Sequence, residues 1–165
     1  MPRGQLAWSP DGTRIAVSHD ALQVSVFAIH DTTTGQAVVT LGLPSAATGT
    51  SPATATAVTY SPDGRRVAAL VSTGSTSADR ELKVWDAATG KEVLAVRRPP
   101  TGSRPIKLNG RLGDDCQLTF NGDGHRLIAW EVGVKLDRAS DGKAGVPAFI
   151  LTTWDASPVP NRTLR

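Results

Sequence analysis

Residues able to do acid–base chemistry are few in this sequence and are spread along it. Its histidines are His19, His30 and His125. The repeat pattern described below places His19 near a loop and His30 at a strand end of one repeat, and His125 in a turn of another. A general acid or base acts only within hydrogen-bond reach of the proton it transfers. No Gly-x-Ser-x-Gly elbow, phosphate-binding Gly-Lys-Ser/Thr loop or His-Glu-x-x-His pair is present. The sequence therefore predicts no catalytic residue and no enzyme.

The aspartates that recur in a regular pattern belong to turns. Asp11, Asp63 and Asp123 each precede a glycine, in tetrapeptides that read Ser-Pro-Asp-Gly twice and Asn-Gly-Asp-Gly once. Glycine accepts the positive φ that closes a hairpin, and proline presets the dihedral before it. Residues 121–124 could be read as calcium ligands, but the twelve-residue ligand series is missing. We therefore expect no metal site and no cofactor.

These turns connect short β patterns that recur three times. The clearest copy, residues 58–96, runs strand, turn, strand, loop, a strand ending in Trp85-Asp86, and a last strand after Gly90. The first copy has His30-Asp31 where the second has Trp-Asp, and the third ends in Trp154-Asp155. Short apolar runs bounded by Gly, Pro and Asp are typical of strands.

The composition fits an all-β chain of one domain. The 165 residues include 16 glycines and 11 prolines, which suit many tight turns, and the net charge is only +3. The lone Cys116 cannot form an internal disulfide and has no metal-site spacing. No apolar run approaches the ~18 residues of a membrane-spanning helix, and no secretory signal opens the chain. We expect a soluble, cytoplasmic protein that does not bind a membrane.

The copies resemble the WD-repeat β-propeller family, whose blades follow this order of strands, Ser-Pro-Asp-Gly turn and terminal Trp-Asp. The resemblance implies an all-β fold, a partial β-propeller of three four-stranded antiparallel blades (WD-repeat type). It divides the single segment 1–165 into blade 1 at 5–41, blade 2 at 56–97 and blade 3 at 115–165. The Gly-His pair that commonly precedes a blade's first strand is missing from residues 42–57 and 97–115.

The structural residues of the repeat follow from this alignment. Those implied by the resemblance are Asp11, Gly12, Asp63, Gly64, Asp123, Gly124, His30, Asp31, Trp85, Asp86, Trp154 and Asp155. All four tryptophans, including Trp8 and Trp130, are expected to pack in cores rather than to bind a ligand.

Three blades in a row would leave one face bare at each end, because a blade buries its faces against its neighbours. Two arrangements would cover the bare faces: the chain is a segment of a longer propeller, or identical chains assemble head to tail into a ring of six or nine blades. Further blades, in cis or in a homo-oligomer, are therefore expected partners.

Long connections gather at one end of the predicted blades. First-to-second and third-to-fourth connections lie at one end of a meander and are short here. The longer stretches 42–54, 72–80, 98–114 and 133–146 fall at the other end. Insertions at one end of a repeat array favour that end for recognition.

Basic residues concentrate in these long connections. The candidate interaction face consists of Arg97, Arg98, Arg104, Lys107, Arg111, Lys135, Arg138 and Lys143. The residues could meet an acidic protein segment or a phosphate backbone, or they could be solubilising loop charges. No aromatic residue interleaves with the cluster, so nucleic acid is not the expected partner.

Two functions are compatible with these features. The resemblance implies a non-catalytic scaffold for protein–protein interaction that binds a protein or peptide through its loop-rich face. Alternatively, the chain is the sensory or regulatory propeller portion of a larger enzyme such as a protein kinase or protease.

Overall fold

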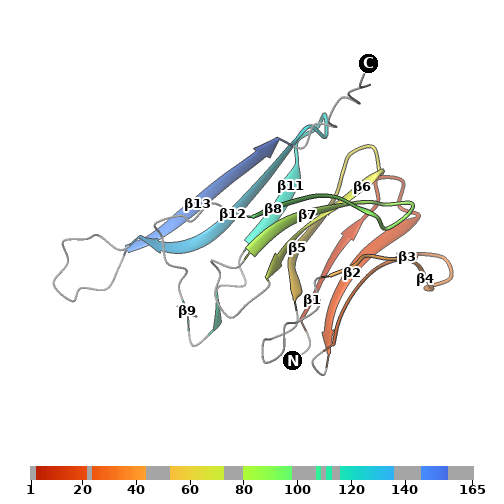
Figure 1. Cartoon of the computed structure of the whole chain (residues 1–165), viewed down its shortest axis with the longest axis horizontal. Coiled ribbons are helices and arrows are strands. Elements are labelled where there is room, and N and C mark those ends of the chain that lie inside the picture. Colours follow the sequence, from red (N-terminus) through yellow and green to blue (C-terminus); the bar gives the residue numbers. More distant parts are fainter. Residues whose placement is uncertain are drawn as a thin grey trace, which may run out of the picture.

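Three antiparallel sheets stand side by side in sequence order, with the second between the other two (Figure 1). The computed structural model describes residues 3–21, 24–43, 53–72, 80–97, 107–108, 111–112, 116–135 and 146–155. All regular structure among these residues is β-strand. None of them forms a helix that could span a membrane. The predicted fold class, an all-β partial propeller, is confirmed.

The first two sheets have four strands each, paired in sequence order. The first consists of β1 (Arg3–Trp8), β2 (Arg14–Ala21), β3 (Val24–Asp31) and β4 (Ala37–Thr40). The second consists of β5 (Thr54–Tyr60), β6 (Arg66–Ser72), β7 (Arg80–Asp86) and β8 (Glu92–Arg97). Every pairing joins neighbours in the chain, so each sheet is an up-and-down meander.

The third sheet has three strands within the described residues, where four were predicted. They are β11 (Cys116–Phe120), β12 (Arg126–Lys135) and β13 (Val146–Asp155). Residues 156–165, where a fourth strand would follow, lie outside the described part of the chain. Two short strands, β9 (Lys107–Leu108) and β10 (Arg111–Leu112), pair with each other inside a stretch that the sequence predicts to be a loop.

Two apolar layers hold the sheets together, and β6 contributes to both. Its Val67, Ala69 and Val71 face the first sheet, while Ala68 and Leu70 face the third. Successive side chains of a strand point to opposite faces, so a strand covered on both sides must be apolar throughout. The unbroken apolar run from Val67 to Val71 is the sequence signature of this central position.

Candidate interaction surfaces

The first-to-second turns are closed by their own aspartates. In the second sheet, the Ser61 hydroxyl donates to Asp63 Oδ1 at 2.5 Å and the Arg65 amide donates to the same oxygen at 3.0 Å. The hydrogen bond from Ser61 lowers the pKa of Asp63 below its ordinary value. Gly64 completes the turn at φ +69°, a conformation that suits glycine.

Equivalent turns in the other two sheets are built in the same way. The Ser9 hydroxyl donates to Asp11 Oδ1 at 2.6 Å, and this bond lowers the pKa of Asp11. The His125 amide donates to Asp123 Oδ1 at 2.7 Å and lowers the pKa of Asp123. All three carboxylates therefore accept hydrogen bonds from residues of their own turns. This is the turn role that the sequence predicts for them.

The third-to-fourth turns also use an aspartate. Asp86 Oδ1 accepts from the Thr89 amide at 2.8 Å and from the Thr89 hydroxyl at 2.7 Å. Asp31 Oδ1 accepts from Thr34 in the same two ways, at 2.8 Å and 3.0 Å. In Asp86 the hydroxyl bond, and in Asp31 the amide bond, makes the largest contribution to a lowered pKa. This end of the blades is thus a set of short turns that satisfy their own polar groups.

The same turn residues also join one sheet to the next. Arg66 Nη2 donates to the Gly124 carbonyl of the third sheet at 2.7 Å, and the guanidinium lies 5.4 Å from the centre of the Phe120 ring. Arg14, at the equivalent position of the first sheet, donates to the Ala87 carbonyl of the second sheet at 3.5 Å. An arginine therefore links each sheet to its successor.

The tryptophans do not share one role, and the packing prediction is wrong for Trp8. Trp85 is buried and meets Phe27 edge to face, with ring centres 5.2 Å apart. Trp154 packs half-buried against the layer between the second and third sheets. Trp130 donates from Nε1 to Gln117 Oε1 at 3.1 Å. Trp8 is 58% exposed, because it points away from the second sheet.

His30 occupies the Trp85 position in the first sheet. Its Nδ1 lies 3.1 Å from the Gly35 carbonyl, within the same turn. His19 lies in β2 and His125 in the turn between β11 and β12. The three histidines are thus on separate elements. Within the described ranges, no group of three His, Cys, Asp or Glu residues is arranged to hold a metal ion.

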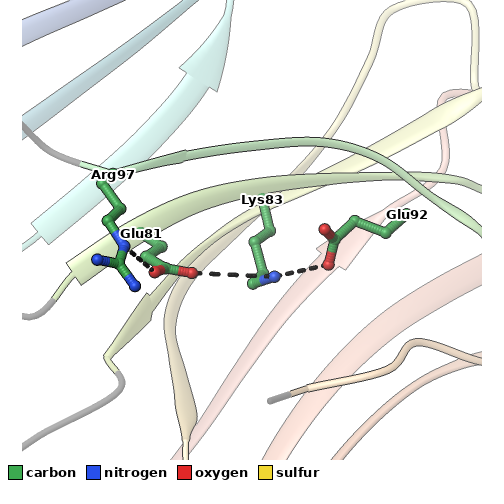
Figure 2. Close-up of polar contacts among 4 residues, drawn as sticks. All are labelled: Glu81, Lys83, Glu92 and Arg97. Carbon is green, nitrogen blue, oxygen red and sulfur yellow. Dashed lines mark hydrogen bonds and ion pairs between the residues drawn. The ribbon is translucent and has the colours of Figure 1, made fainter.

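A row of alternating charges crosses β7 and β8, as Figure 2 shows. Lys83 Nζ lies 2.6 Å from Glu92 Oε2 and 3.9 Å from Glu81 Oε2, and Arg97 Nε lies 3.0 Å from Glu81 Oε1. The Lys83 side chain is only 9% exposed, so the paired carboxylates compensate a largely buried ammonium group. The sequence analysis missed this row. The signal that could have indicated it is the pair of charged residues Glu81 and Lys83, two positions apart in the same strand.

Of the predicted basic face, Arg97 is the residue whose side chain the structure describes. The side chain is 89% exposed and belongs to the charge row just described. Lys107, Arg111 and Lys135 lie in β9, β10 and β12. Arg98, Arg104, Arg138 and Lys143 lie outside the described residues, so the basic face stays a prediction.

Comparison with known proteins agrees with this architecture. Residues 46–86 match the WD40 family model, described as "WD domain, G-beta repeat". Hsv2 of Kluyveromyces lactis is similar in structure, with a TM-score of 0.51, 13% identity, and coverage of 92% of this chain and 46% of Hsv2. The C-terminal WD40 domain of Sif2 gives a TM-score of 0.49, 18% identity, and coverage of 79% and 32%. The chain thus spans less than half the length of either structure. No curated protein matches the sequence significantly.

Proposed function

We propose that this chain is a WD-repeat scaffold without catalytic activity, which binds a protein or peptide through its loop-rich end. WD40 propellers are in general platforms for protein–protein interaction, and the fold alone does not name a partner. The proposal extends this general role to one end of the blades.

The observation that carries the proposal is the unequal length of the connections at the two ends. At one end, the β1–β2, β3–β4, β5–β6, β7–β8 and β11–β12 turns are all short. Their aspartates already accept hydrogen bonds from their own turns. At the other end, residues 22–23 form one short connection, whereas residues 41–53, 73–79 and 136–145 form longer connections between strands. Recognition residues concentrate on such variable connections, held by a rigid scaffold.

The chemistry of these connections favours an acidic partner. The stretch from Arg97 to Gly113 holds five basic residues and no acidic one. Opposite charges on two binding partners raise their association rate and disfavour partners of like charge. They add less to affinity when the charged groups stay in water. We expect an acidic peptide segment to bind there, with an association rate that falls as salt is added.

Charge reversal at the two ends tests this proposal. Peptides that bind the wild-type chain are selected from a displayed library, and their dissociation constants are measured for two variants. One variant carries Arg98→Glu and Arg104→Glu in the long connections. The control carries Arg65→Glu and Lys91→Glu at the short-turn end, where both side chains are exposed. Arg97 is left unchanged, because Arg97→Glu would place a second carboxylate beside that of Glu81.

We expect the loop variant to bind selected acidic peptides at least about tenfold more weakly, which corresponds to a loss of ~1.4 kcal/mol. The control variant should bind like the wild type. Equal binding by both variants, or a greater loss in the control, would rule out the loop-rich end as the basic docking face. A selection that returns no binding peptide would count against the peptide-binding role itself.

A further inference from the structure

The contact between successive blades repeats its chemistry from one pair to the next. A Cβ built on Gly64 would lie 3.5 Å from Pro10 Cδ, and one built on Gly124 would lie 3.4 Å from Pro62 Cδ. The turn of each blade thus packs on the turn of the blade after it. Arg66 adds its hydrogen bond and ring contact to the second of these pairs. We call the side of a blade that faces the next blade in the chain its giving side. The side that faces the preceding blade is its receiving side.

Within the part of the chain that the structure describes, nothing covers the receiving side of the first blade. Trp8 is 58% exposed, whereas the equivalent Tyr60 and Phe120 are each 8% exposed. Leu6 is 60% exposed, whereas its counterpart Leu118 is 7% exposed. Among the described residues, no atom lies within 4 Å of a Cβ built on Gly12.

The uncovered residues form one continuous surface. β1 pairs with β2 so that Trp8 is opposite Ile15 and Leu6 is opposite Val17. Ala7, between the two exposed residues, packs toward the second sheet, so Leu6 and Trp8 point the other way. We call Leu6, Trp8, Ile15 and Val17 the open face. Exposed apolar patches on a sheet mark interaction sites.

The giving side of the third blade also carries exposed residues. Arg126 begins β12 at the position that Arg66 has in β6, and it is exposed. Leu151 is 68% exposed, whereas the equivalent Leu82 of the second blade is 1% exposed. The third blade therefore carries an exposed arginine and an exposed leucine at the positions where the second blade has Arg66 and Leu82, which face the third blade.

We propose that the third blade of one copy docks on the open face of a second copy, so that two chains close a six-bladed ring. Arg126 takes the place over the Trp8 ring that Arg66 takes over Phe120, and tryptophan is the aromatic side chain that attracts a guanidinium most strongly. Two chains of three blades fall within the ~4–8 blades of ordinary propellers, whereas three chains would exceed that range. This assembly does not depend on what the loop-rich end binds.

Light scattering coupled to size-exclusion chromatography tests the proposal on the whole chain. At micromolar concentration, we expect twice the chain mass of 17.3 kDa. Trp8→Arg places a cation opposite Arg126 and should halve the measured mass. Val93→Arg is the matched control, because Val93 is 55% exposed on the covered second blade, outside the open face. Circular dichroism checks that both variants keep their β-structure.

A charge exchange identifies the two sides of the contact. Arg126→Glu alone should give the monomer mass, and Trp8→Arg combined with Arg126→Glu should restore the dimer. A wild-type chain of monomer mass would overturn the proposal and leave the open face to a blade from another polypeptide. A dimer that survives Trp8→Arg, or that is lost equally on Val93→Arg, would overturn it too, as would failure of the double variant to reassociate.

Discussion

The contact of Arg66 with the third blade gives the sharpest prediction about how the blades hold together. The perturbation is Arg66→Ala, which removes the 2.7 Å bond to the Gly124 carbonyl and the guanidinium from the Phe120 ring. A hydrogen bond from a charged donor contributes ~1.5–3 kcal/mol. A cation–π contact at a partly exposed site adds ~0.5–1 kcal/mol. We therefore expect a loss of about 2–4 kcal/mol in the free energy of unfolding.

Urea unfolding followed by tryptophan fluorescence measures this loss, at one fixed protein concentration so that association does not alter the comparison. With a urea slope of about 2 kcal/mol/M, the middle of the ~1–3 kcal/mol/M range of small proteins, the midpoint should fall by roughly 1–2 M. Arg65→Ala is the matched control, because the Arg65 side chain is exposed. Exposed substitutions of this kind stay within ~0.5 kcal/mol of the wild type.

A double-mutant cycle with Phe120→Leu separates the ring contact from the hydrogen bond. The coupling energy between Arg66 and Phe120 should be ~0.5–1 kcal/mol. If Arg66→Ala unfolds at the same urea concentration as Arg65→Ala, the arginine does not join the blades. The reasoning that extends its role to Arg126 would then fail with it.

Two further predictions concern the turns. Gly35→Ala should cost ~1–2 kcal/mol for its left-handed backbone alone, since no described atom lies within 4 Å of the new Cβ. Gly90→Ala should cost ~1–3 kcal/mol more, because its Cβ would lie 2.5 Å from the Thr40 carbonyl oxygen; equal urea midpoints for the two variants would refute this close approach. The lowered pKa of Asp63 stabilises the fold above the ordinary value of 3.8, and this contribution is lost as the pH falls through the folded pKa. Asp63→Asn should therefore unfold more easily at neutral pH and lose less stability on acidification, and a pH profile parallel to the wild type would contradict the role of this carboxylate.

Local signals made the strands and turns predictable from the sequence. The tetrapeptide ending in Asp63-Gly64 specifies its hairpin through residues that contact only one another. The apolar run from Val67 to Val71 predicts a strand covered on both faces, and β6 has that position. Because the same pattern recurs in the first and third copies, the same strands and turns could be predicted there.

Features that depend on distant neighbours were beyond the sequence. Trp8 and Tyr60 occupy the same place in the repeat, yet 58% of Trp8 and 8% of Tyr60 are exposed, because Tyr60 packs in the layer between the first two sheets and no described sheet covers Trp8. The pairing of Lys83 with Glu92 depends on strand register across a bulge between Val84 and Trp85. Neither burial nor register of this kind is encoded in a residue's own position in the repeat.

The meander connectivity has a consequence for how the chain acquires its structure. Every ladder of backbone hydrogen bonds in the three sheets joins strands that follow each other in the chain, so each sheet needs only short loop closures. We expect a nascent chain to complete one sheet before the next has been synthesised. Cooperativity across the molecule would then come late, from the two apolar layers between the blades, and weakening those layers should uncouple the sheets before any single sheet unfolds.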